Sequence, residues 1–201
     1  TDPDGTNILS SSSALYNFSS GRTGGYGFAS VLVPHTTNFS AKAGTWTFKN
    51  YANDRVKLTL RTGSTPSTAT FIVQPYITGT TWSANDIASA LFVMSNIYSN
   101  NGITLSVKDT ITISESQYAT VSSSFIDSTT SALVSQGSDE TVNLFFVEDQ
   151  PSSETAILGV SAGIPGTMSI ASSWNGVINY LSAHATGSTL NSQVLGETVA
   201  H

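Results

Sequence analysis

The basic residues of this 201-residue chain are confined to its first 108 positions. Residues 1–82 carry six basic and three acidic residues, a net +3, whereas residues 83–201 carry Lys108 and ten acidic residues, a net −9. A change of charge this sharp predicts two folding units, with a boundary near Gly79 to Thr81. The length allows two small domains. Opposite charges could help the units dock, and independent drift in composition would give the same pattern.

The first unit, residues 1–82, has the pattern of a β-structure. Four segments are predicted strands: residues 26–33, 44–48, 55–61 and 69–77. In 55–61 apolar and polar residues alternate strictly, which places Val56, Leu58 and Leu60 inward and the basic residues outward. Pro75 indicates that 69–77 ends there or lies at a sheet edge. Short strands at this spacing predict a small β-sandwich.

The second unit, residues 83–201, alternates helix and strand. Residues 83–100 carry an apolar stripe at helical spacing, and Ser83 with Asp86 has capping-box spacing. Further segments are predicted in this order: strand 103–107 with a continuation at 111–113 after a turn, a loop with a short helix in 121–133, strand 142–147, a Gly-rich loop 159–166, strand 176–180 and helix 190–201. The run 142–147 is nearly all apolar, as expected of a strand covered on both faces. The fold class is therefore α+β and multidomain.

Composition excludes several kinds of function. Only 10% of residues are charged, against about 25% in ordinary soluble proteins, and Ser and Thr take their place. Such a surface is typical of exported bacterial proteins. The net charge of −6 argues against nucleic acid as a partner. The absence of cysteine excludes disulfides, thiolate metal sites and cysteine nucleophiles. No apolar run reaches the ~18 residues of a membrane span.

The last six residues, Gly196-Glu-Thr-Val-Ala-His201, are the most informative for function. In zinc metallopeptidases a helix carries His-Glu-x-x-His, in which the histidines at i and i+4 bind one Zn²⁺. The intervening Glu is the general base for the zinc-bound water. Residues of the type Leu-Gly-Glu-Thr-Val-Ala commonly lead into the first histidine. The segment resembles such a helix cut after its first ligand, His201, although a lone terminal histidine can also be incidental.

Residues 83–201 resemble the upper part of a metzincin catalytic domain. The order of helix, strand, buried strand, Gly-rich loop, edge strand 176–180 and ligand helix is the order in that family. The segments 96–103, 143–147 and 158–166 look like their counterparts in secreted bacterial, pappalysin-like metallopeptidases. Residues 24–78 resemble the jelly-roll domains that accompany secreted proteases. The Glu and the other histidines of the family motif are absent from this chain.

The resemblance implies a fragment of a secreted or cell-surface zinc endopeptidase. Residues 1–82 would be an accessory or pro-domain, and residues 83–201 the N-terminal part of the catalytic domain. The full-length enzyme would use Zn²⁺ on protein or peptide substrates, with His201 as a ligand. The chain by itself, with at most one zinc ligand and without the general base, is expected to be inactive.

Other candidate sites are weaker. The acidic pairs Asp139-Glu140 and Glu148-Asp149 flank strand 142–147 and could bind Ca²⁺, although solvated loop charge is the commoner arrangement. His35 and His184 have no second histidine or carboxylate at ligand spacing. The three tryptophans could form a platform on which sugars stack, although tryptophans more often lie in a core or a domain seam. The tryptophans are Trp46, Trp82 and Trp174.

Two other functions remain open on the sequence alone. One is an extracellular binding or adhesin-like protein without catalysis. The other is a serine hydrolase, because Gly159-Val-Ser161-Ala-Gly163 matches Gly-x-Ser-x-Gly. That motif needs a strand–turn–helix elbow, and Pro165 and Gly166 disfavour a helix at this place.

Overall fold

The computed structural model describes residues 1–7, 20–22, 29–31, 43–49, 68–154, 157–161, 173 and 176–201. The chain forms two compact units. The first comprises Thr1–Arg61 and Gly163–Gly166, and the second comprises Thr62–Ala162 and Thr167–His201.

The first unit contains one described strand pair, in which β1 (Ser20–Arg22) runs antiparallel to β2 (Ala29–Val31). β2 lies within the predicted strand 26–33. The predicted strand 44–48 has no assigned strand; instead the backbone of Thr47 and Thr1 exchanges two hydrogen bonds. The predicted strand 55–61, with Val56, Leu58 and Leu60, lies outside the described residues. The β-sandwich therefore stays a prediction.

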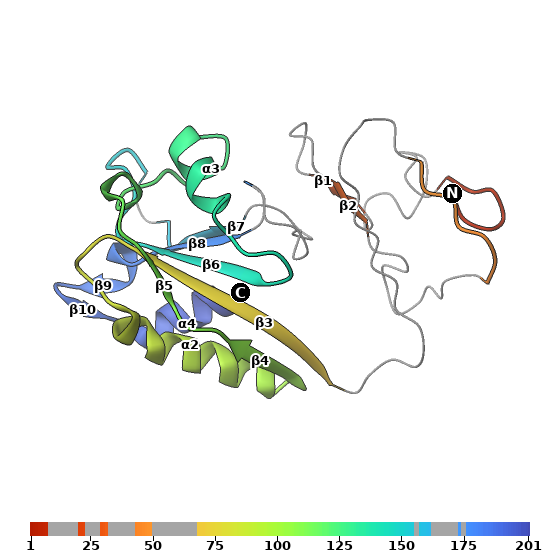
Figure 1. The fold of residues 1–201 in the computed structure, drawn as a ribbon. Coiled ribbons are helices and arrows are strands. Elements are labelled where there is room, and N and C mark those ends of the chain that lie inside the picture. Colours follow the sequence, from red (N-terminus) through yellow and green to blue (C-terminus); the bar gives the residue numbers. More distant parts are fainter. Residues whose placement is uncertain are drawn as a thin grey trace. The chain divides into compact units, whose positions relative to one another are not determined.

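The second unit is built on a mostly parallel sheet with the strand order β4-β3-β6-β8-β7 (Figure 1). The first four run parallel, β7 is antiparallel to β8, and β5 also pairs in parallel with β3. The strands are β3 (Ala69–Thr78), β4 (Ile103–Val107), β5 (Ile111–Ile113), β6 (Val142–Val147), β7 (Gly159–Ser161) and β8 (Val177–Tyr180). A small hairpin pairs β9 (Ala185–Thr186) with β10 (Thr189–Leu190). The second unit is thus mixed α+β.

The helices α2 (Ala84–Ser99) and α4 (Ser192–Ala200) cover one face of this sheet (Figure 1). The predicted helix 83–100 is confirmed: the Ser83 backbone N–H donates to Asp86 Oδ2 at 2.7 Å, and the helix ends at Asn100. The core on this face joins side chains of both helices to alternate residues of β3 and β6. It comprises Val73, Ile77, Ile87, Ala90, Leu91, Met94, Leu144, Phe146, Leu181, Leu195 and Val199.

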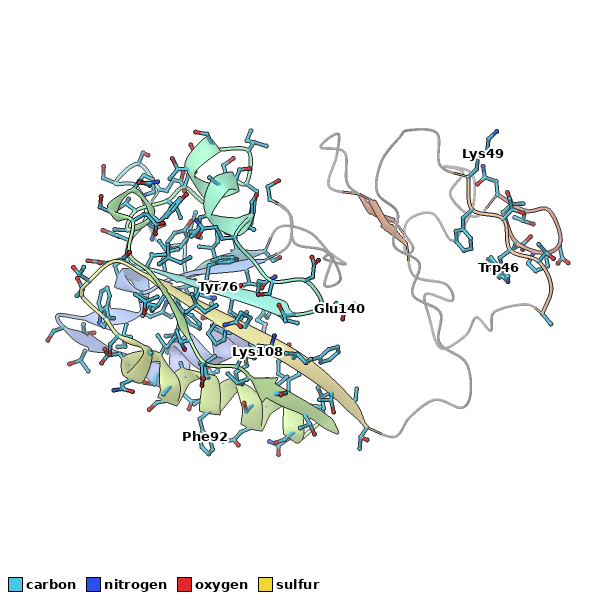
Figure 2. All side chains as sticks on the ribbon, in the orientation of Figure 1. Trp46, Lys49, Tyr76, Phe92, Lys108 and Glu140 are labelled. Carbon is cyan, nitrogen blue, oxygen red and sulfur yellow. The ribbon has the colours of Figure 1, made fainter. Side chains whose placement is uncertain are left out.

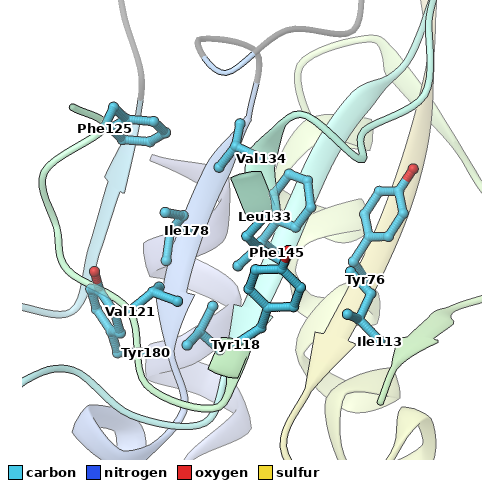
Figure 3. Close-up of a cluster of buried hydrophobic side chains, with 11 residues drawn as sticks. Tyr76, Ile113, Tyr118, Val121, Phe125, Leu133, Val134, Phe145, Ile178 and Tyr180 are labelled. Carbon is cyan, nitrogen blue, oxygen red and sulfur yellow. The ribbon is translucent and has the colours of Figure 1, made fainter. Parts of the chain in front are cut away.

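The opposite face is covered by α3 (Ser128–Val134), by the 3₁₀ turn η1 (Ser116–Tyr118) and by the loop between them. Their apolar side chains pack on Tyr76, Phe145 and Ile178 of the sheet (Figure 3). The rings of Tyr76 and Phe145 stack with centroids 4.7 Å apart. Because both faces are covered, β6 is buried almost throughout, as its apolar sequence predicts.

The predicted domain boundary near residue 82 is wrong by an entire strand. Residues 69–78, assigned from sequence to the sandwich, form β3, which pairs with three strands of the second unit. Pro75 misled the prediction because proline usually lies at strand edges. The Lys108 N–H donates to the Val73 carbonyl oxygen at 2.9 Å, so the backbone carbonyl of Val73 points to the β4 side of β3. Because backbone groups alternate sides along a strand, the backbone nitrogen of Pro75, two residues later, points to the same side. At this position the neighbouring segment has left β4 and has not yet begun β5. No backbone carbonyl there requires the N–H that proline lacks.

Two further expectations need correction. Residues 159–161, predicted as the start of a Gly-rich loop, form strand β7 at the edge of the sheet. Residues 177–180, predicted as an edge strand, form β8, which lies between β6 and β7. The antiparallel pairing of β7 is a long-range contact, and its short, Gly-containing sequence gives no strong strand pattern.

Candidate functional site

The C-terminal helix α4 presents His201, the candidate zinc ligand. Asn191 caps the helix with its Oδ1, which accepts from the Val194 N–H at 3.2 Å. Leu195, Gly196 and Val199 face the core, as the apolar spacing of the segment predicts. A Cβ at Gly196 would lie 2.6 Å from the carbonyl oxygen of Ala90, so glycine allows the close approach of α4 to α2.

The end of α4 is held by backbone and side-chain hydrogen bonds. The His201 N–H donates to the carbonyl of Glu197 at 3.1 Å. Tyr98 of α2 donates its hydroxyl to the carbonyl of Ala200 at 3.0 Å. The side chain of His201 is exposed. The last turn of α4 is therefore anchored to α2 while its histidine faces solvent.

A zinc site at His201 would need further ligands from the residues that the structure describes. Among those residues no group of three or more histidine, aspartate or glutamate side chains is arranged to hold a metal ion. His35 lies outside the described residues. A catalytic zinc needs three protein ligands, so the donors described here do not by themselves form a zinc site.

His184, which lies in a Ser- and Gly-rich stretch of the sequence, is buried. It belongs to the 3₁₀ turn η2 (Ser182–His184), and its side chain is 4% exposed. Its Nδ1 lies 2.8 Å from the carbonyl oxygen of Tyr180, and its Nε2 lies 3.1 Å from Thr198 Oγ1 on α4. Burial lowers the pKa of His184 below its usual value, and the bond to Tyr180 opposes this in part. The ring is thus a neutral connector between the end of β8 and α4.

Ser161, the alternative nucleophile, is exposed at the end of β7, opposite Val177 of β8. The turn and helix that a nucleophile elbow requires would follow in residues 162–172, outside the described part of the chain. Both ring nitrogens of His184 are engaged by Tyr180 and Thr198, which leaves neither to act as a base for Ser161. The geometry gives no support to the serine hydrolase hypothesis.

The acidic pair Glu148-Asp149 anchors loops at the carboxyl ends of the strands. Glu148 accepts hydrogen bonds from the Thr80 N–H at 2.7 Å and from the hydroxyl of Thr81, which lower its pKa. Asp149 accepts from Ser182 Oγ at 2.6 Å. Gly79, at φ +80°, permits this packing, because a Cβ there would collide with the Glu148 carboxylate. These carboxylates are therefore engaged by loop donors, neither solvated freely nor grouped around a cation position.

The other acidic pair, Asp139-Glu140, lies in the turn before β6, where Glu140 adopts a positive φ of 61°. Figure 2 shows Glu140 on this loop, which leads into β6, whereas Glu148 directly follows the last residue of β6. The two acidic pairs are therefore at opposite ends of β6 and do not combine into one cation site.

The tryptophans have separate surroundings. Trp46 is in the first unit, and Trp174 is outside the described residues. Trp82 packs partly buried against the core under α2, as a core residue would. The surroundings of Trp82 are therefore those of a core residue.

The structure also shows buried polar groups that the sequence analysis did not identify. Asn179 of β8 is 0% exposed, and neither its Nδ2 nor its Oδ1 has a hydrogen-bond partner. The hydroxyl of Tyr180, the next residue, is also buried without a partner, and burial raises its pKa. In the sequence, the burial of Asn179 is indicated only by its place within the otherwise apolar strand Val177-Ile-Asn-Tyr180.

Among the helices that the structure describes, none has the length and apolar character to cross a membrane. Comparison of the chain with models of protein families, with curated proteins and with solved structures finds no match. A functional assignment therefore depends on the chain's own residues and geometry.

Proposed function

We propose that this chain is the N-terminal portion of a secreted zinc endopeptidase of the metzincin type, with His201 as the first ligand of its zinc. The observation that carries the proposal is α4: it follows β8, packs on α2, and ends in Gly196-Glu-Thr-Val-Ala-His201. A His-Glu-x-x-His motif begins with a histidine on such a helix.

The order of elements in the second unit supports the same proposal. α2 is followed by β4, the buried β6, the edge strand β7, β8 and then α4, in a mostly parallel sheet. The resemblance noted above has a helix, a strand and a buried strand in the same order before the ligand helix. It places a Gly-rich loop at 159–166 and the edge strand at 176–180, whereas here β7 is the edge strand and β8 lies between β6 and β7. With β3 included, the catalytic part begins before residue 83.

Zinc catalysis requires ligands and a general base in addition to His201. A second ligand is expected one turn after His201, since residues four apart share one helix face. When bound, Zn²⁺ lowers the pKa of a coordinated water and polarises the scissile carbonyl. The role of this chain is to hold the first ligand on a helix whose end is fixed by Tyr98. Protein or peptide chains are the proposed substrates.

The low charge content and the Ser and Thr residues that take the place of charged ones support secretion or a place at the cell surface. A binding or adhesin-like protein without catalysis would share these properties. The codons that follow His201 in the gene distinguish the two: Glu-x-x-His supports the peptidase, and a stop codon supports the binding protein.

The activity itself is tested by cleavage of casein with and without EDTA. A longer chain that continues through His-Glu-x-x-His should cleave casein, and EDTA should abolish the cleavage. Replacing the new Glu by Gln should remove activity while the metal stays bound, since the Glu acts as a base and not as a ligand. EDTA-sensitive cleavage by the 201-residue chain would place the site elsewhere.

A further inference from the structure

His184 contacts both the N-terminal and the C-terminal end of helix α4. Its backbone carbonyl accepts a hydrogen bond from the N–H of Asn191, the N-cap residue, at 2.8 Å. Its Nε2 lies 3.1 Å from Oγ1 of Thr198, near the C-terminal end of the helix. Its Nδ1 lies 2.8 Å from the carbonyl oxygen of Tyr180, the last residue of β8. One side chain therefore connects the strand to the helix that follows it.

The chemistry of these partners determines where the proton of the ring resides. The Tyr180 carbonyl can only accept, so Nδ1 must carry the proton. A neutral imidazole has one N–H, so Nε2 is an acceptor and Thr198 is its donor. The Thr198 hydroxyl also donates to the Val194 carbonyl oxygen at 2.9 Å, so its single proton is shared between that oxygen and Nε2. If Nε2 were protonated, the hydroxyl would donate to Val194 alone.

We propose that His184, as the Nδ1–H tautomer, is the positioning residue of α4: it accepts the Thr198 hydroxyl hydrogen bond and so fixes the helix that ends in His201 against β8. That this connection also positions His201 for zinc rests on the proposed function. The connection between β8 and α4 itself is independent of that function.

The methyl group of Thr198 lies beside Gly159 of β7. A Cβ built at Gly159 of β7 would lie 3.4 Å from Thr198 Cγ2 and 2.9 Å from Asn179 Oδ1. The methyl group therefore faces β7 while the hydroxyl faces His184. Asn179 makes no hydrogen bond to either residue, so the Thr198–His184 bond is the polar connection at this seam among the described side chains.

The tautomer is tested on the unmodified 201-residue chain by ¹⁵N–¹H correlation NMR of the histidine rings at pH 7.5. We expect His184 to show a protonated Nδ1 and an unprotonated Nε2. Exposed His201 serves as the internal reference. A protonated Nε2 on His184 would overturn the proposal.

The positioning role is tested by hydrogen exchange of the α4 amides in two variants. Thr198→Val removes the hydroxyl at nearly constant shape, and Thr198→Ser keeps it. Loss of one hydrogen bond of ordinary strength should speed exchange in α4 roughly two- to tenfold, with little change in β3 and β6. Thr198→Ser should restore the slower exchange. Unchanged exchange in Thr198→Val, or equal acceleration in both variants, would contradict the role.

These outcomes are separable from the proposed function. In a longer chain with the complete motif, Thr198→Val should weaken zinc affinity and Thr198→Ser should retain it. If the longer chain binds no zinc while the tautomer and exchange results hold, the peptidase proposal fails and the connector stands. If zinc binds and Thr198→Val has no effect on its affinity or on exchange, the connector fails and the peptidase proposal stands.

Discussion

At the scale of single residues, burial alters the acid–base chemistry of His184. Its burial lowers its pKa, so the unfolded chain binds a proton at higher pH than the folded chain does. Between the usual value of 6.5 and the lower pKa of the folded state, the unfolded state holds more protons. The free energy of unfolding should therefore fall as pH decreases through this window and level off below it.

This pH dependence is measured by urea unfolding at pH values between 7.5 and 5. In His184→Gln the fall in stability that begins near pH 6.5 should be absent or much reduced. The carboxylates with lowered pKa, such as Glu148, lose their contribution only near and below the ordinary value of 4.5, so the two effects separate. A variant with the same pH profile as the unmodified chain would show that His184 is not the responsible group.

Residue-level prediction from sequence succeeded where the cause is local. The hydrogen bond of Ser83 to Asp86 depends on residues three apart, and the structure confirms it. The burial of His184 depends on Thr198 and Tyr180, which only the packing of α4 beside β8 brings together. The unpartnered amide of Asn179 likewise results from strand pairing with β6 and β7.

At the scale of elements, α2 stabilises the second unit through one face only. Leu91 is 8% exposed and lies in the core, whereas the adjacent Phe92 is 66% exposed and points away from the sheet (Figure 2). Leu91→Ala should lower the free energy of unfolding by about 2–5 kcal/mol, because it leaves a cavity. Phe92→Ala, the matched control, should change it by less than about 0.5 kcal/mol. Chemical denaturation measures both, and equal effects would refute the assigned helix face.

The contact between α2 and α4 depends on Gly196. Alanine normally favours a helix over glycine by about 1 kcal/mol, which by itself predicts that Gly196→Ala stabilises. The new Cβ would, however, lie 2.6 Å from both the Ala90 carbonyl oxygen and Val93 Cβ, so the helices must separate. Overpacking of this kind costs about 1–3 kcal/mol, and we expect net destabilisation.

Thermal or urea unfolding of Gly196→Ala gives the sign of the change directly. Glu197→Ala, at an exposed position on the same helix, serves as the control and should be nearly neutral. A more stable Gly196→Ala would mean that α4 does not approach α2 as closely as described.

At the scale of the whole molecule, the sequence predicted the elements of the second unit better than their grouping. Helices α2 and α4 and strands β4, β6 and β8 follow from apolar periodicity, which is a local signal. The boundary near residue 82 was wrong because the charge pattern reports surface composition, while β3 joins the second unit through pairing with β4, β5 and β6. Strand order and the edge position of β7 are long-range properties with no local signature.

The candidate site follows the same distinction. The helix that carries His201 was predictable from its spacing, whereas the contacts that hold it, from Tyr98 and His184, required the fold. The central claim is that α4 presents the first zinc ligand of a peptidase. It requires that the helix continue past His201 with the remaining residues of the motif. It is accordingly tested by metal binding.

The most direct measurement is the zinc content after dialysis of the 201-residue chain, of a chain extended through the following codons, and of that extended chain with His201→Ala. The account predicts stoichiometric zinc in the extended chain, its loss in the His201→Ala variant, and none held by the 201-residue chain. An extended chain without zinc, zinc retained after His201→Ala, or stoichiometric zinc in the 201-residue chain would contradict it.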